Sequence, residues 1–364
     1  MKWKQMTSHQ KRKLSFGFLL YILTAALFLG HVVRTMLIEK NLADVEYAST
    51  LDSFSTENAD RTALSADTVP VTSGAYVETI KNISLKDNAF RVEFILWFRW
   101  ENGQNLSFLE NNLHIRNGTI NHMEVLEDYH DGALHYQSMR IDATISKNFD
   151  AACFPLGTQV LSFYISPENY TSDTVILVPD TENSGINSNL SASGYSPIRS
   201  NISSTLLRHL NTMGNPLLNE PEEISHLIVA LELNRNSWGL FFQCFIALFG
   251  TVGWILITLY ICANHRIDPL LTLPPALFGA VSNLIVGTNL LPDMAQFGLV
   301  EYMNFYGILM ILAGTLSIIQ VNRIRDYTQD HDYADSYGRV MFFTLLILSI
   351  AGMLMMPAVT YRWR

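Results

Sequence analysis

Long apolar runs without a charged residue are the most prominent pattern along the chain. A helix needs about 20 apolar residues to cross a bilayer, and five runs reach that length. They cover residues 14–33, 236–265, 269–292, 302–322 and 340–361. Because helices of a soluble core rarely run so far without a charge, we interpret these runs as transmembrane helices. The alternative interpretation is a set of buried helices in a large soluble core.

Between the first and second runs the pattern changes to alternation. Within Phe90–Trp100, apolar residues at every second position from Phe90 to Leu96 give a strand one apolar face, with Arg91 and Glu93 on the other. The same alternation is found over residues 71–85, and three further segments resemble it: 135–145, 158–165 and 224–234. Turn-forming sequences lie between them, at Glu101-Asn102-Gly103, Asn117-Gly118 and Asp131-Gly132. Many short strands within about 165 residues predict an antiparallel β-sandwich.

Two segments show neither pattern. Residues 35–70 are mostly polar after the first apolar run and are predicted to be a linker, and residues 182–220 are rich in Asn, Ser and Gly and are predicted to form long loops. The expected fold is therefore β + α: a β-sandwich, a four-helix transmembrane bundle and one N-terminal transmembrane helix. The expected divisions are a basic tail 1–13, an anchor 14–34, a linker 35–70, the sandwich 71–236 and the bundle 237–364.

Composition excludes several functional classes. Charged residues make up 16% of the chain, against about 25% in an ordinary soluble domain. The net charge of −9 argues against nucleic acid as a partner. Cys153, Cys244 and Cys262 are too few for a disulfide framework or a cysteine zinc site. No nucleophile elbow, phosphate loop or paired-histidine zinc motif is found, so we expect no enzyme, no metal and no cofactor.

The distribution of charge predicts an orientation. Five Lys or Arg residues precede the first apolar run, which places the N-terminus in the cytoplasm. The run is longer than the core of a signal peptide, so we expect an uncleaved anchor, with a cleaved signal peptide as the alternative. Residues 38–235 then lie outside, and the loop 323–339 returns to the cytoplasm with Arg323, Arg325 and Arg339.

The predicted outer domain is strongly acidic. Residues 38–236 hold 26 acidic and 12 basic side chains, a net charge of −14. Such a surface attracts cations, and clustered carboxylates raise one another's pKa and respond to protons or calcium. The alternative is that the charge only keeps the domain soluble.

Four short sequences resemble one known family. Residues 149–161 contain Phe154-Pro155 followed by Gln159, and Leu231–Asn236 carries Arg235 directly before the second apolar run. Residues 280–292 end in Asn289-Leu290-Leu291-Pro292, and Trp97-Phe98-Arg99-Trp100 closes a strand. In this order, followed by four apolar runs, they resemble the bacterial pentameric ligand-gated ion channels of the Cys-loop receptor superfamily. The resemblance covers about residues 70–361.

The resemblance implies a homopentamer in the bacterial inner membrane, with a periplasmic sandwich and four helices M1 to M4. These would span about residues 238–262, 268–291, 301–321 and 340–361. The second would line a pore through Arg266, Leu270, Pro274, Leu277, Val281, Leu284 and Thr288. The alternative is that this stripe packs against neighbouring helices.

The resemblance also implies how binding would reach the pore. Ligand binding would be passed on by Phe154, Pro155, Gln159, Arg235 and Pro292. A small molecule, a proton or a cation would bind between neighbouring sandwiches near Tyr129, Tyr136, Tyr164, Tyr170 and Tyr195. The alternative for each tyrosine is packing in the core or plain surface exposure.

Several departures from the family pattern leave other functions open. The bridging cysteines are absent, and Gly157 stands where the family has a carboxylate that helps to hold the arginine equivalent to Arg235. Pro274-Pro275 are expected inside the second helix, where they would free carbonyl groups of the preceding turn. Arg266 beside Asp268 leaves the charge selectivity undecided. The alternatives are a non-conducting membrane sensor or assembly subunit, and a membrane-anchored binding protein.

Overall fold

The computed structural model describes most of the chain. It covers residues 6–51, 68–101, 106–109, 112–190, 192, 194–208, 210–212, 222–235, 238–265, 267–269, 274–291 and 297–361, without the side chains of 46–51, Leu277, Val286 and Thr288. The chain forms two compact units. A helical unit comprises Met1–Asn41, Ala151–Gly157 and Ser237–Arg364, and a β unit comprises Leu42–Asp150 and Thr158–Asn236.

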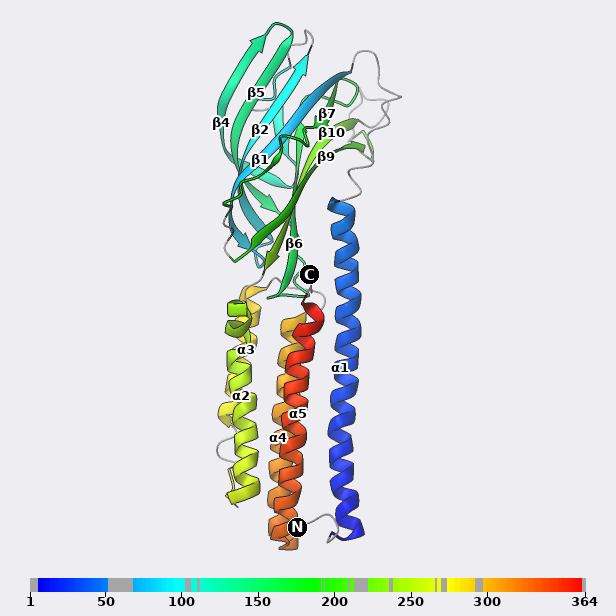
Figure 1. Cartoon of the computed structure of the whole chain (residues 1–364), viewed down its shortest axis with the longest axis vertical. Coiled ribbons are helices and arrows are strands. Elements are labelled where there is room, and N and C mark those ends of the chain that lie inside the picture. Colours follow the sequence, from blue (N-terminus) through cyan, green and yellow to red (C-terminus); the bar gives the residue numbers. More distant parts are fainter. Residues whose placement is uncertain are drawn as a thin grey trace. The chain divides into compact units, whose positions relative to one another are not determined.

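The β unit contains two sheets. A six-stranded sheet has the order β4-β5-β2-β1-β7, with β8 beside β1, and a four-stranded sheet has the order β3-β6-β10-β9 (Figure 1). Their bounds are β1 Val69–Ser84, β2 Ala89–Glu101, β3 Leu113–Ile115, β4 Gly118–Asp131, β5 Leu134–Ser146, β6 Gly157–Pro167, β7 Val175–Pro179, β8 Gly185–Ile186, β9 Ser196–Arg208 and β10 Glu223–Arg235. The predicted strands at 71–100, 135–145, 158–165 and 224–234 are confirmed.

Alternation along the strands builds the core of the β unit. Every second side chain of β2, from Phe90 to Trp100, is buried, as predicted. The ring of Phe94 on β2 lies 4.8 Å from that of Phe163 on β6, between ring centroids, so the two sheets share one apolar core. Burial of such large side chains is the main stabilising contribution to the unit.

The sequence analysis missed the long edge strands β4 and β9, as well as the short strands β3, β7 and β8. The strand β4 is largely exposed and polar, and β9 falls inside the segment 182–220 that was predicted to be loops. Each has a hydrogen-bonded neighbour on one side only, β5 and β10 respectively. An edge strand needs few apolar residues, since backbone pairing to its neighbour fixes it. The prediction of loops over 182–220 was therefore wrong for Ser196–Arg208.

Among the described residues, five helices form the helical unit, although the end of α1 from Leu42 onward is assigned to the β unit (Figure 1). They are α1 Ser8–Leu51, α2 Trp238–His265, α3 Pro274–Leu290, α4 Leu299–Thr328 and α5 His331–Thr360. In the described part of the chain, α1 over Ser8–Val45, α2, α4 and α5 are long and apolar enough to cross a membrane. The fifth, α3, has 17 residues and is shorter than such a span requires.

The helices α1, α4 and α5 extend beyond the apolar runs that predicted them, whereas α2 lies within its run. The first, α1, reaches Leu51, so residues 35–51 of the predicted linker are helical, while 52–67 lie outside the described residues. The predicted loop 323–339 is also corrected, because α4 ends at Thr328 and α5 begins at His331. Backbone hydrogen bonding continues a helix into polar sequence, whereas the search for uncharged runs stops at the first charge.

The two prolines are the first described residues of α3, and the expected kink inside the helix stays a prediction, because the residues directly before them lie outside the described part. Residues 267–269 are not helical, 270–273 lie outside the described part, and α3 starts at Pro274. Proline suits the first turn of a helix, where its missing N–H has no intrahelical acceptor. Whether the carbonyls of Leu270 and Leu271 are free lies outside the described residues.

The N-terminal helix packs on α4 and α5. The hydroxyl of Tyr21 donates to the carbonyl of Ala313 at 3.1 Å and accepts from Ser317 at 3.1 Å. Farther along, the ring of Phe28 stacks on that of Tyr306, with centroids 5.7 Å apart. These contacts make α1 an integral helix of the unit as well as an extension of the chain.

Candidate functional site

The helix α3 has one face that is attached to its neighbours. Gly279 lies against Thr251 of α2, where any larger side chain would collide. The buried Asn283 donates a hydrogen bond from Nδ2 to Oδ1 of Asn304 on α4, at 2.7 Å. Small residues allow helices to approach closely, and a buried amide pair fixes their register. This face holds α3 against α2 and α4.

The opposite face of α3 is exposed and largely apolar. Phe278 is 74% exposed, Val281 53% and Ile285 55%. Ser282 and Asn289 are exposed on the same side of the helix. The five positions recur with the period of a helix, so they form one continuous surface, called here the α3 face.

The predicted pore stripe coincides only partly with the α3 face. Pro274 and Val281 are exposed, but Leu284 is half-buried. Leu277 and Thr288 belong to α3 with side chains outside the described part, and Arg266 and Leu270 lie outside the described residues. The sequence analysis missed Phe278 and Ile285. The small residues on the opposite, attached face could have indicated that these two side chains are exposed.

The loop Ala151–Gly157 belongs to the helical unit and lies against the start of α4. The N–H of Leu299 donates to the carbonyl of Ala152 at 2.8 Å. Gly298 permits this approach, because a Cβ there would lie 3.0 Å from the carbonyl oxygen of Ala152 and 3.1 Å from that of Ala151. The loop also carries Phe154, which is buried, and Pro155, which follows a cis peptide bond. Two of the predicted coupling residues are thus fixed beside the N-terminus of α4.

The two ends of this loop are joined in the β unit. Gln159 donates from Nε2 to the carbonyl of Asp150 at 2.5 Å. Gly157 has φ +101°, a conformation that side chains other than glycine rarely adopt. Any residue other than glycine would therefore be strained at this position.

Arg235, the last residue of β10, has a partner in the β unit. Its Nη1 donates to the hydroxyl of Tyr195 at 3.0 Å, and its guanidinium carbon lies 4.7 Å from the centroid of the tyrosine ring. Burial raises the pKa of Tyr195, although the guanidinium opposes this shift. Tyr195 is thus a partner of Arg235 within the β unit. The remaining predicted coupling residue, Pro292, lies outside the described residues.

The five candidate ligand tyrosines do not gather in one place. Tyr129 and Tyr136 contact each other across β4 and β5, with ring centroids 5.3 Å apart. Tyr164 lines a separate pocket of about 280 Å³ that it shares with His226. The hydroxyl of Tyr170 accepts a hydrogen bond from a backbone N–H, and Tyr195 is buried against the arginine described above. Within one chain they form no common pocket.

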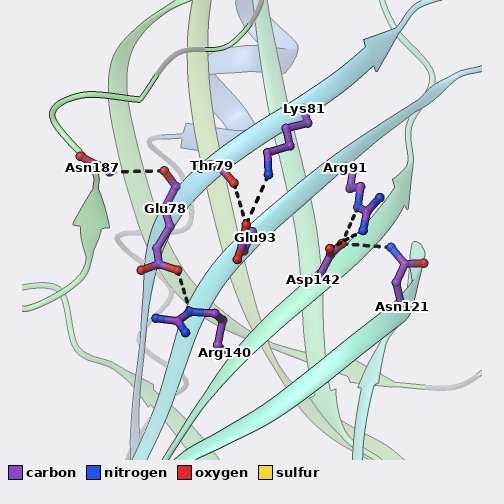
Figure 2. Close-up of polar contacts among 9 residues, drawn as sticks. All are labelled: Glu78, Thr79, Lys81, Arg91, Glu93, Asn121, Arg140, Asp142 and Asn187. Atoms are coloured by element: carbon purple, nitrogen blue, oxygen red, sulfur yellow. Dashed lines mark hydrogen bonds and ion pairs between the residues drawn. The ribbon is translucent and has the colours of Figure 1, made fainter.

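Charged residues on the outer side of the six-stranded sheet are arranged in opposite pairs (Figure 2). Arg91 donates to both carboxylate oxygens of Asp142, at 2.7 and 2.5 Å, and Arg140 contacts Glu78 at 3.0 Å. The hydrogen bond from Arg91 holds the pKa of Asp142 below its usual range. This is opposite to the rise expected of clustered carboxylates, so this surface does not have the character of a proton-sensing cluster.

A polar network joins α2, α4 and α5, and the sequence did not reveal it. Arg325, 8% exposed, contacts Asp335 at 3.0 Å and also donates to the carbonyl of Cys262. Beside it, Asn322 donates to Oδ1 of Asp268 at 2.7 Å. Asp268 is therefore bound by an amide of α4, whereas Arg266, its expected partner, lies outside the described residues.

Comparison with known proteins adds no identification. Neither a protein-family model nor a curated protein matches the chain. Within the described residues, no group of three or more His, Cys, Asp or Glu side chains could hold a metal ion. The candidate functional features are therefore defined by the geometry within each unit: the α3 face and the loop against α4 in the helical unit, and the Arg235–Tyr195 contact in the β unit.

Proposed function

We propose that the chain is one subunit of a pentameric ligand-gated channel-like receptor in a bacterial inner membrane. In this proposal a small molecule, proton or cation binds to the periplasmic β-sandwich formed by the two sheets. Binding opens a pore that is lined by α3 of five identical chains. The observation that carries the proposal is the α3 face, which no other described element of the chain covers.

The composition of the α3 face favours a contact with water and with other copies. Exposed apolar side chains alone are unremarkable in a membrane, since lipid tails are apolar too. Ser282 and Asn289 are exposed beside them, and polar groups are expensive in lipid and tend to face a bundle interior or a water-filled cavity. Apolar rings from Phe278, Val281 or Ile285 would form a constriction that closes a pore by dewetting.

The loop Ala151–Gly157 supports a coupling role. The chain leaves the β unit at Asp150, forms this loop in the helical unit and returns to the β unit at Thr158. Its hydrogen bond to Leu299 lies at the start of α4, directly after the connection from α3. A movement of the strands that flank the loop would therefore act on the connection between α3 and α4.

The second candidate is a non-conducting sensor or assembly subunit with the same fold. The described length of α3 favours it, because the 17 residues from Pro274 to Leu290 fall short of the about 20 that cross a bilayer. The additional helix α1 favours it as well, since the resembling family has no such helix in its usual plan.

Currents across liposome patches that hold the purified chain distinguish these candidates. Val281→Ser places a polar ring in the proposed constriction and is expected to leak ions without ligand. Ile347→Ser is the matched control, because Ile347 is an exposed apolar residue of α5, 65% exposed, outside the α3 face.

Current in Val281→Ser that exceeds both the parent chain and Ile347→Ser supports the channel. Silence in all three, with insertion into the liposomes verified, overturns the channel and leaves the sensor. Equal leak in both variants also counts against a pore at α3, since it indicates a general disturbance of the helical unit.

A further inference from the structure

The helical unit contains a groove with one basic and one apolar end. It has a volume of about 990 Å³ and lies where the first turns of α1 face the last turns of α4. Three exposed cationic side chains line it: Arg12 and Lys13 of α1 and Arg323 of α4. Among the described residues that line the groove, none is acidic.

The lining changes from basic to apolar along both helices in the same direction. The two helices run antiparallel, because Gln10 contacts Asp330 after the end of α4 whereas Tyr21 contacts Ala313 in its middle. Moving away from the cations, the groove is lined by Phe16, Leu20, Leu316 and Ile319. At a rise of 1.5 Å per residue, the step from Arg12 to Leu20 covers about 12 Å.

The walls of the groove are held in place by contacts within the chain. The side chain of Gln10 donates to Oδ2 of Asp330 at 2.7 Å, and the hydroxyl of Tyr333 donates to the carbonyl of Gln10 at 3.0 Å. Gly17 leaves space for Tyr337, whose hydroxyl would lie 3.0 Å from a Cβ at that position. The groove is therefore present before any ligand arrives.

Cations at one end and apolar side chains beyond them match one class of molecule. An anionic headgroup gains charge-assisted contacts with Arg and Lys, and an acyl chain covers exposed apolar surface such as Phe16, 69% exposed, and Leu316, 58% exposed. Basic pockets between transmembrane helices at the cytoplasmic side bind anionic lipid headgroups. A zwitterionic headgroup carries a cation as well as an anion, so its attraction to the basic side chains of the groove is much weaker.

We propose that the groove between α1 and α4 binds an anionic phospholipid of the inner leaflet. The inference rests on the part of the proposed function that places these helices in a membrane, and it is independent of the pore. It assigns α1 a role beyond anchoring the chain, because the groove has no second wall without it.

Native mass spectrometry of the purified full-length protein in detergent tests the proposal. The protein is titrated with phosphatidylglycerol and separately with phosphatidylcholine, and phosphatidylglycerol is expected to bind more tightly. The triple variant Arg12→Gln/Lys13→Gln/Arg323→Gln is expected to lose about 100-fold in affinity for phosphatidylglycerol alone. Ile319→Gln is expected to weaken both lipids, because it removes an apolar contact with the chain.

The matched control is Arg339→Gln compared with Arg323→Gln. Arg339 is exposed near the start of α5 and donates to Asn264, but it does not line the groove. Arg323→Gln is expected to weaken phosphatidylglycerol binding about fivefold, and Arg339→Gln to leave it unchanged.

Three outcomes overturn the proposal: equal affinity for the two lipids, an equal loss in Arg323→Gln and Arg339→Gln, or displacement of phosphatidylglycerol by inorganic phosphate at equal concentration. The last would indicate a site for a free anion. A protein that binds phosphatidylglycerol as expected but conducts no ions fails only the channel proposal. One that conducts ions without this lipid preference fails only the present one.

Discussion

The helices α5 and α3 both pack against α4, but in different ways. Along α5 the contacts reach from one end to the other. Arg325 of α4 contacts Asp335 near the start of α5, and the buried ring of Tyr306 fills the space beside Gly352 near its end. The hydroxyl of Tyr306 also donates to the carbonyl of Leu348 at 2.7 Å. At this contact the Nη2 of Arg325 and the hydroxyl of Tyr306 thus have partners within the same chain.

The contact of α3 with α4 is narrower. Asn283 and Asn304 form a buried pair, and Gly287 leaves room for Val300. Beyond this face, α3 exposes both apolar and polar side chains. The difference teaches that the described contacts fix α5 on α4 along most of its length, whereas α3 is held by one narrow face. The other face of α3 keeps both polar and apolar side chains exposed, as assembly around α3 would require.

Removing the charge of Asp335 is expected to have the largest effect on the α4–α5 contact. Asp335→Asn leaves the buried Arg325 without its carboxylate, and breaking a buried pair in this way costs about 3–5 kcal/mol. The melting temperature of the purified protein in detergent should fall clearly. Asp326→Asn is the control, since Asp326 is exposed on α4 and its loss should change little. Equal melting temperatures of the two variants would show that the pair does not hold the helices together.

Filling the space at Gly352 is expected to have an intermediate effect. In Gly352→Ala the new methyl group collides with the ring of Tyr306, and overpacking of this kind costs about 1–3 kcal/mol. Gly250→Ala on α2 is the control, because a Cβ there meets no atom within 4 Å and alanine favours the helix by about 1 kcal/mol. The melting temperature should fall in the first variant and hold or rise in the second. A rise in both would contradict the described contact.

Breaking the amide pair of α3 is expected to have the smallest effect on stability. Asn283→Ala removes one hydrogen bond between helices, which is worth about 1 kcal/mol in membrane proteins. The melting temperature should fall slightly, while the oligomer measured by native mass spectrometry should loosen, since α3 loses its register on α4. Ser282→Ala, one residue away on the exposed face, keeps the pair and serves as the control. If the oligomer of Asn283→Ala is as stable as that of the parent chain, the Asn283–Asn304 pair does not contribute to assembly.

The sequence predicted the parts of the fold that repeat a simple pattern. Alternation located β2 because its buried residues contribute directly to the core, and uncharged runs located α2, α4 and α5. The edge strands β4 and β9 were not predicted, because hydrogen bonds to a neighbouring strand can hold a polar sequence that shows no pattern of its own. The predicted helices were too short wherever charged residues continue the helix beyond the uncharged run.

The candidate site was predictable only where residues that are close in sequence are also close in the structure. The loop from Phe154 to Gln159 and the position of Arg235 followed from motifs. The contact of Arg235 with Tyr195 joins residues 40 positions apart, and the network of Arg325 depends on how three helices meet. Such contacts depend on tertiary packing, which no local pattern contains. The place of Pro274 within its helix was not predictable, since the sequence alone does not show whether a proline begins or interrupts a helix.

Disulfide cross-linking is the most direct test of the claim that the α3 face contacts other copies of the chain. Ile285→Cys places a thiol on the α3 face, and Ile347→Cys places one on an equally exposed position of α5. After mild oxidation in membranes, the account predicts cross-linked dimers of the Ile285→Cys chain, well above the parent chain, and none for Ile347→Cys. Cross-linking of Ile347→Cys alone, or of neither variant in protein shown to be inserted, would contradict assembly around α3.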